Sequence, residues 1–95
     1  MTSEYTKELI SPADTDTASE EFSLVLFNDS YHEFDAVVNQ IIKATGYSHD
    51  KAEAITMEAH TRGRAVVISG DLDLCLKAQA VLEEIGLRTS IEVSA

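Results

Sequence analysis

The chain has 95 residues, enough for one small domain and little more. Its 17 acidic side chains against 7 basic ones give a net charge of −10. This charge argues against nucleic acid and membranes as partners, because nucleic acid and anionic membranes need a basic face. Apolar residues make up 44% of the sequence, which is enough to form a core. The single cysteine, Cys75, excludes an internal disulfide, and its Leu-Cys-Leu context predicts a buried thiol.

Residues 1–22 differ in composition from the rest of the chain. They hold six acids against Lys7, the only proline, and few apolar residues. This composition predicts a flexible acidic extension, which is either a solvated tail or a segment steered toward a partner. Residues 23–95 then form the domain. The N-terminus lacks a basic segment followed by an apolar one, and no run approaches the roughly 18 apolar residues of a membrane span. We therefore expect a cytoplasmic protein.

The predicted elements begin with a short apolar run, residues 23–27, which is typical of a buried strand. The turn-forming sequence Asn-Asp-Ser ends it. Apolar residues at helical spacing then predict an amphipathic helix from Phe34 to Thr45, ended by Gly46. A second helix, capped by Ser48 or Asp50, follows and stops at a glycine. We place one face of this second helix at Ala52, Ile55, Thr56, Ala59 and His60.

The remaining elements complete one small sheet. The β-branched residues 64–68 predict a second strand, and residues 69–71 a turn and the start of a third helix, which Gly86 closes. We assign the apolar face of this helix to Leu72, Cys75, Leu76, Gln79, Leu82 and Ile85. Residues 89–93 alternate polar and apolar, as in an edge strand. The order β-α-α-β-α-β predicts an α+β fold, a single two-layer domain whose three-stranded antiparallel sheet packs with three helices.

Three acceptor groups suggest a binding site. The amide oxygen of Asn28, the carboxylate of Asp29 and a neutral imidazole nitrogen of His60 can all accept hydrogen bonds. If the fold brings them together beside an apolar pocket, the site suits a small cation with three donors, such as a free peptide α-amino group. On spacing alone, however, His60 at the end of an apolar stripe is more commonly a histidine satisfied within the core. Both interpretations stay open at this point.

Catalytic chemistry has little support in the sequence. His32 and Glu33 are ligand types, as are Asp29 and His60, but no HExxH or comparable metal-ligand spacing occurs. Ser30 lacks the glycine-flanked elbow of a serine hydrolase, and no glycine-rich phosphate loop is present. We expect no catalytic residue, no metal and no cofactor, and a small hydrolase that uses Asp29 and His60 ranks last.

Two segments resemble the Clp protease adaptor family, ClpS. Residues 24–32, Leu-Val-Leu-Phe-Asn-Asp-Ser-Tyr-His, are similar to the apolar strand running into Asn-Asp-Asp with which those domains begin. Residues 52–65 resemble the second signature of the family, a helix ending in His-x-x-Gly-Lys-Ala. The last strand, with residues 90–92, is also similar. The resemblance covers roughly residues 22–95 and includes the order of the helices.

The resemblance implies an adaptor, without catalysis of its own, that binds N-degron substrates. Such adaptors recognise a free α-amino group and a bulky N-terminal side chain, Phe, Tyr, Trp or Leu, and deliver the substrate to a Clp-type AAA+ unfoldase through its N-terminal domain. The positions that match amine binding are Asn28, Asp29 and His60. The positions that match the hydrophobic pocket are Leu26, Phe34, Val37, Thr56, Ala59 and Leu87. The unfoldase-facing surface would include Asp71, Asp73 and Lys77.

Four departures from the family pattern matter. Ser30 replaces the common second aspartate, and His32 replaces a small hydroxyl residue; we expect both at the rim, against the bound backbone. His32 would add a hydrogen bond or a mild pH dependence. Phe34 and Thr56 stand where typical bacterial members carry methionines, and the short Thr56 should relax the rejection of Ile and Val. The changes also keep an alternative alive, a regulatory or inhibitory partner of a Clp unfoldase with a degenerate pocket.

Overall fold

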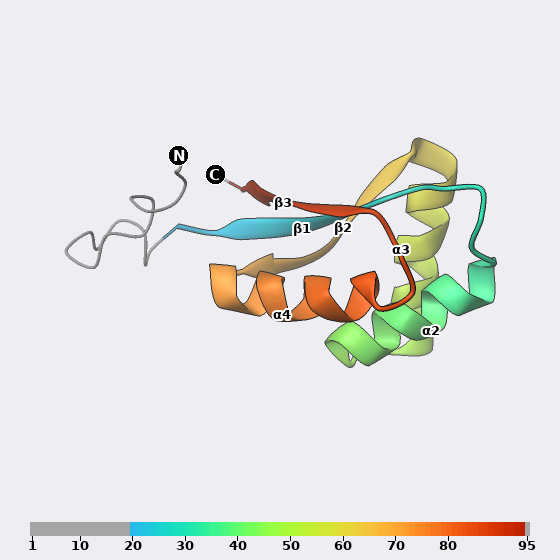
Figure 1. Ribbon diagram of the computed structural model, residues 1–95, viewed down its shortest axis with the longest axis horizontal. Coiled ribbons are helices and arrows are strands. Elements are labelled where there is room, and N and C mark those ends of the chain that lie inside the picture. Colours follow the sequence, from blue (N-terminus) through green and yellow to red (C-terminus); the bar gives the residue numbers. More distant parts are fainter. Residues whose placement is uncertain (1–19, 95) are drawn as a thin grey trace.

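The computed structural model describes residues 20–94, so most of the predicted extension, residues 1–22, lies outside the described residues. The elements follow in the predicted order β-α-α-β-α-β (Figure 1). Their bounds are β1 Phe22–Phe27, α2 Phe34–Thr45, α3 His49–Arg62, β2 Arg64–Gly70, α4 Leu72–Glu83 and β3 Thr89–Val93. The predicted α+β class, with three antiparallel strands and three helices, is confirmed.

The sheet has β1 at its centre. Its strand order is β2-β1-β3, and β1 pairs antiparallel with both neighbours. The register between β1 and β2 shifts between Leu24 and Val25, whose partners are Ile68 and Val66. Residues 69–70, which the sequence suggested for a turn, instead extend β2. The prediction that residues 89–93 form an edge strand is confirmed.

The helices form the second layer. Helix α4 contacts all three strands, α3 contacts β2, and α2 lies against both α3 and α4 (Figure 1). The core lies between the two layers, and its largest fully buried side chains include Leu24, Leu26, Ile41 and Leu82. Each such side chain contributes roughly 1.5–3 kcal/mol by leaving water.

Local signals set the helix ends. Gly46 and Gly63 end α2 and α3 in the left-handed region, with φ of 80° and 92°, a conformation that glycine adopts without steric cost. Of the two caps expected for α3, Ser48 is the one used, because its side chain accepts from the Lys51 N–H at 3.2 Å. Asp50 lies inside the first turn, where its charge favours the positive end of the helix dipole.

The predicted apolar face of α4 is partly wrong. Cys75, Ala78 and Leu82 are buried, whereas Leu76 is 47% exposed and Ile85 lies in the turn after the helix. Ala78 lies on the buried face of α4, which packs against the strands, and Leu76, two residues earlier and so on nearly the opposite side of the helix, points outward. The Cys75 thiol is buried as expected, and burial raises its pKa.

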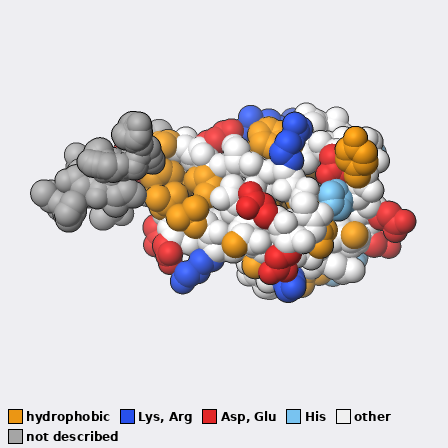
Figure 2. Space-filling view, in the orientation of Figure 1, with side chains coloured by type: hydrophobic (Ala, Val, Ile, Leu, Met, Phe, Trp, Pro, Cys, Tyr) orange, Lys and Arg blue, Asp and Glu red, His pale blue; other side chains and the backbone are white. Residues whose placement is uncertain are grey.

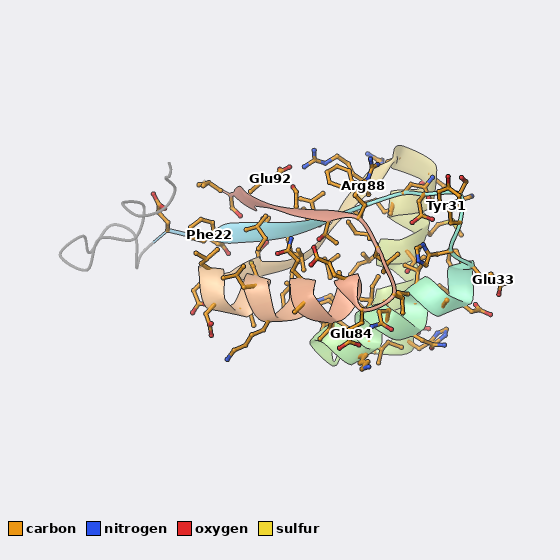
Figure 3. All side chains as sticks on the ribbon, in the orientation of Figure 1. Phe22, Tyr31, Glu33, Glu84, Arg88 and Glu92 are labelled. Atoms are coloured by element: carbon orange, nitrogen blue, oxygen red, sulfur yellow. The ribbon has the colours of Figure 1, made fainter. Side chains whose placement is uncertain are left out.

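The face of the sheet away from α4 carries polar side chains (Figure 3). Arg64 of β2 donates to Glu92 of β3 at 2.7 Å, so this pair spans the central strand. Two guanidinium groups lie over the Phe27 ring, with the Cζ atoms of Arg64 and Arg88 5.5 and 5.1 Å from its centroid. Acidic side chains are spread over the face shown in Figure 2. Within residues 20–94, no helix is long and apolar enough to cross a membrane.

Candidate functional site

A pocket of about 380 Å³ lies at the carboxyl end of β1. This volume is within the range of ligand pockets in proteins, roughly 300–1,000 Å³. All six residues predicted from the sequence to form a hydrophobic pocket line it: Leu26, Phe34, Val37, Thr56, Ala59 and Leu87. The same pocket is lined by Asn28, Asp29, Ser30, His32 and His60. Phe27 and Met57, which the sequence did not indicate as pocket residues, line it as well.

Two backbone hydrogen bonds explain why these segments meet. The Phe27 N–H donates to the Arg88 carbonyl, and the Asn28 N–H donates to the Gly63 carbonyl, both at 3.0 Å. The end of β1 is therefore held between the segment that precedes β3 and the turn that follows α3. Because Gly63 comes just after the last turn of α3, the second bond places that turn, with His60, at the side of the pocket near Asn28.

His60 is exposed in the last turn of α3 and lines the pocket, so the interpretation of His60 as a core histidine is wrong. The neighbouring Ala59 takes the buried position and is 3% exposed. Successive residues of a helix are about 100° apart around its axis, so His60 turns away from the core when Ala59 faces it. Within residues 20–94 the imidazole has no hydrogen-bond partner, which leaves its nitrogens available to a ligand.

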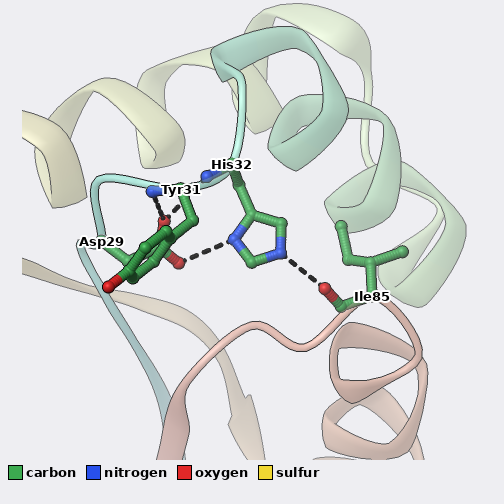
Figure 4. Close-up of polar contacts among 4 residues, drawn as sticks. All are labelled: Asp29, Tyr31, His32 and Ile85. Carbon is green, nitrogen blue, oxygen red and sulfur yellow. Dashed lines mark hydrogen bonds and ion pairs between the residues drawn. The ribbon is translucent and has the colours of Figure 1, made fainter.

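Asp29 is a carboxylate held in place by its own loop (Figure 4). Its Oδ1 accepts from the N–H groups of Tyr31 and His32, both at 2.9 Å, and its Oδ2 accepts from the His32 ring at 2.8 Å. A carboxylate offers about four acceptor positions, so about one remains for a ligand. Burial by itself raises the pKa of Asp29, but these hydrogen bonds outweigh it and hold the pKa below its ordinary value. The group is therefore ionised at neutral pH.

His32 lies on the pocket lining, but its ring is engaged within the protein (Figure 4). Besides Nδ1, which contacts the Asp29 carboxylate, Nε2 lies 2.5 Å from the Ile85 carbonyl oxygen. The sequence suggested a direct hydrogen bond from His32 to a bound backbone, but both ring nitrogens are already engaged, so neither is free to make it. The Ile85 carbonyl, then the Asp29 carboxylate, raise the pKa of His32, while burial opposes them. The sequence carries no signal for the contact with Ile85, because a distant backbone carbonyl has no side-chain signature.

The apolar wall is well buried. Leu26, Ala59 and Leu87 are at most 4% exposed, and Thr56 is 5% exposed. The Thr56 hydroxyl donates to the Ala52 carbonyl at 2.8 Å, one turn back in α3. Its polar atom is thus satisfied inside the helix, and Thr56 presents the pocket with a short side chain. This wall suits an apolar group rather than a polar one.

The residues predicted to face an unfoldase lie at the start of α4, and none lines the pocket. Asp71 is the N-cap and accepts from the Leu74 N–H at 2.8 Å. Asp73 and Lys77 form an exposed ion pair at 3.1 Å, of a kind that contributes little to stability. Their contact with a partner stays a prediction.

One group of potential metal ligands occurs among the described residues. His49, Asp50 and Glu53 lie together at the start of α3, all exposed and none lining the pocket. Exposed acidic groups are common without a metal, so this cluster gives no reason to assign one to the site.

The chain is similar to known proteins in sequence and in structure. The chain matches the family model described as ATP-dependent Clp protease adaptor protein ClpS over residues 17–90. Among solved structures, it is similar to Agrobacterium tumefaciens ClpS2 bound to L-phenylalaninamide, with a TM-score of 0.72 and 26% sequence identity. That match covers 79% of this chain and 98% of the other. No curated protein sequence matches the chain.

Proposed function

Because the chain belongs to the ClpS family of Clp protease adaptors, we propose that it recognises N-degron substrates and delivers them to a Clp-type AAA+ unfoldase. The family match confirms the resemblance noted in the sequence. It also agrees with the expectation that the chain is not an enzyme, since the family consists of adaptors. The proposal that the chain recognises N-degron substrates is supported by one pocket that has an apolar wall and three acceptor side chains at its edge.

The polar edge fits a free α-amino group. An α-ammonium has three N–H donors and a positive charge, and Asn28, Asp29 and His60 offer an amide oxygen, a carboxylate and an imidazole nitrogen. The remaining acceptor position of ionised Asp29 makes a charge-assisted bond, roughly twice as strong as a neutral one. Internal residues of a protein lack this charge and these donors, so they are excluded.

The apolar wall fits the first side chain of the substrate. Burying a Leu or Phe side chain contributes roughly 1.5–3 kcal/mol, whereas micromolar binding needs about 8 kcal/mol. Amine recognition and pocket filling must therefore act together, which selects substrates with N-terminal Phe, Tyr, Trp or Leu. The ligand of the similar ClpS2, L-phenylalaninamide, combines a free α-amino group with an aromatic side chain, which supports the same pairing here.

Delivery would involve other parts of the chain. Residues 1–22 would engage the unfoldase during transfer of the substrate, and Asp71, Asp73 and Lys77 would face its N-terminal domain. Asp71, Asp73 and Lys77 do not line the pocket, so contact of an unfoldase with them would leave the pocket open to a substrate. A cytoplasmic location follows from this role.

Fluorescence anisotropy with a Phe-initiated peptide and its N-acetylated twin tests the proposal. Acetylation removes the positive charge and two of the three N–H donors, and hydrogen bonds to charged groups contribute about 1.5–3 kcal/mol each, so we expect roughly 100-fold or greater discrimination. His60→Ala should abolish most of it. His49→Ala is the matched control, because His49 is exposed on the same helix but does not line the pocket. Absence of binding to either peptide would favour the regulatory partner with a degenerate pocket, and turnover would favour a hydrolase.

A further inference from the structure

One side chain joins the two loops that border the pocket. His32, in the loop between β1 and α2, contacts the Asp29 carboxylate through Nδ1 at 2.8 Å and the Ile85 carbonyl through Nε2 at 2.5 Å (Figure 4). Both partners can only accept hydrogen bonds, because Asp29 is ionised and a carbonyl has no proton. A neutral imidazole carries one N–H and can satisfy one of them. Both bonds exist together only when the ring is an imidazolium.

We propose that His32 is a positioning residue for amine recognition, a proton-dependent clamp that fastens the loop bearing Asn28 and Asp29 to the turn ahead of Leu87. Loss of its proton as pH rises then weakens binding of a free N-terminus. The proposal rests on the proposed function, in which Asp29 binds the α-amino group.

Both ends of this clamp reach pocket residues. At one end, the ring bonds to Oδ2 of Asp29. This bond fixes the orientation of the carboxylate, and so the direction in which its remaining acceptor position points. At the other end, Ile85 lies two residues before Leu87, which is 4% exposed and lines the apolar wall. A neutral ring must release one end. Releasing Asp29 leaves its carboxylate held through Oδ1 alone, so that Oδ2 is no longer fixed, and releasing Ile85 loosens the turn that precedes Leu87.

The surrounding charges favour the protonated ring. Among the described residues, the charged group that acts on His32 is the Asp29 carboxylate from its own loop. The turn between α4 and β3 contributes the Ile85 carbonyl, which carries no net charge. The Glu84 carboxylate in the same turn is paired with Lys43 at 2.8 Å rather than with His32. The carbonyl and the carboxylate raise the pKa of His32 above its ordinary value. The clamp is therefore complete below about pH 6.5 and is lost as pH rises through the higher pKa of the folded protein.

Two substitutions each preserve one end of the clamp without titrating. The amide nitrogen of His32→Asn occupies roughly the place of Nδ1 and can reach Asp29, while that of His32→Gln occupies the place of Nε2 and can reach Ile85. The affinity for a Phe-initiated peptide is measured from pH 5.5 to 8.5 for all three proteins. Dividing the wild-type affinity by that of each variant cancels the titration of the peptide amine. We expect ratios of about tenfold at pH 6 that fall toward one by pH 8.5.

A second readout needs no ligand. NMR of the imidazole nitrogens should show His32 doubly protonated at pH 6 and titrating above about 6.5. The difference in unfolding free energy between wild type and His32→Asn should decrease over the same interval. An affinity ratio that stays constant with pH, or a ring that titrates at or below its ordinary pKa, would overturn the proposal. If no protein binds peptide, the proposed function fails, and the ring titration alone still decides whether the clamp exists.

Discussion

On the proposed function, Thr56 decides how well a β-branched N-terminal residue fits the pocket. Thr56 is 5% exposed, and it lines the pocket with Ala59 from the next turn of α3 and Val37 from α2. Its hydroxyl is bonded to the Ala52 carbonyl, so the side chain has one fixed orientation. Thr56→Met replaces this short group by a longer, unbranched chain. Because the neighbours of Thr56 are buried, the added atoms would extend into the pocket.

The size of the effect follows from the groups that compete for this space. Ile and Val carry a methyl or methylene branch on the β-carbon that Leu lacks, and each buried group of this kind contributes about 0.8 kcal/mol. When the Met side chain displaces this branch and the group beside it, binding of Ile or Val loses about 1.4 kcal/mol, which is about tenfold in affinity. We expect the wild-type protein to prefer Leu over Ile by less than about tenfold, and Thr56→Met to increase this preference about tenfold.

Anisotropy titrations with peptides beginning with Phe, Leu, Ile or Val measure these ratios. Thr56→Val is the matched control, because it keeps the branched shape and replaces by a methyl group only a hydroxyl that is bonded within α3. It should leave the Leu-to-Ile ratio unchanged. The reasoning is refuted if the wild-type protein rejects Ile and Val by more than about 100-fold relative to Leu, about 2.7 kcal/mol, or if Thr56→Met leaves the ratio as it was.

Three further predictions concern delivery, stability and acid sensitivity. Removal of residues 1–19, the part of the predicted extension 1–22 that leaves β1 intact, should spare peptide binding and impair degradation of substrates by the unfoldase with its peptidase. Equal loss of both activities would contradict this. Tyr47→Phe removes the hydrogen bond from the hydroxyl to the Val67 carbonyl, 2.9 Å long, and should lower the free energy of unfolding by about 0.5–1.5 kcal/mol in urea titrations, with peptide affinity unchanged. The lowered pKa of Asp29 means that its contribution to stability is present above about pH 3.9 and lost as pH falls through the lower folded value. Unfolding of wild type and Asp29→Asn should therefore converge toward acid pH, and a constant difference from pH 6 to pH 2 would exclude this contribution.

The types and order of the elements could be predicted because their signals are local. The glycines at positions 46 and 63 have φ of 80° and 92°, and each directly follows the last residue of its helix. The rotation of a helix about its axis depends on its neighbours in space, so no local signal in the sequence predicts it. Ala78 was therefore missed as a core residue of α4, and Leu76 was wrongly assigned to its buried face.

The same limit applies to the site. Residue spacing placed His60 at the edge of the apolar stripe of α3, which fits both a core position and a pocket position. A rotation of about 100° separates the two, and the burial of Ala59 decides it. The pocket positions came from the family resemblance, which carries three-dimensional information that periodicity lacks. The contact between His32 and Ile85 joins a side chain to a backbone carbonyl far along the chain, and no residue pattern indicates it.

The central place of β1 has a consequence for the lifetime of the site. Its backbone amides are protected by a partner on each side, so we expect their hydrogen exchange to require unfolding of the whole domain. Leu26 and Phe27, which line the pocket, belong to this strand, whereas residues 28–33 form a partly exposed loop that has no strand partner and is held by single contacts such as that of His32 with Ile85. On the proposed function, the N-terminus of a substrate would contact a strand that stays folded as long as the domain does and a loop that rearranges more readily. The rearrangement of this loop would therefore set how long the substrate stays bound.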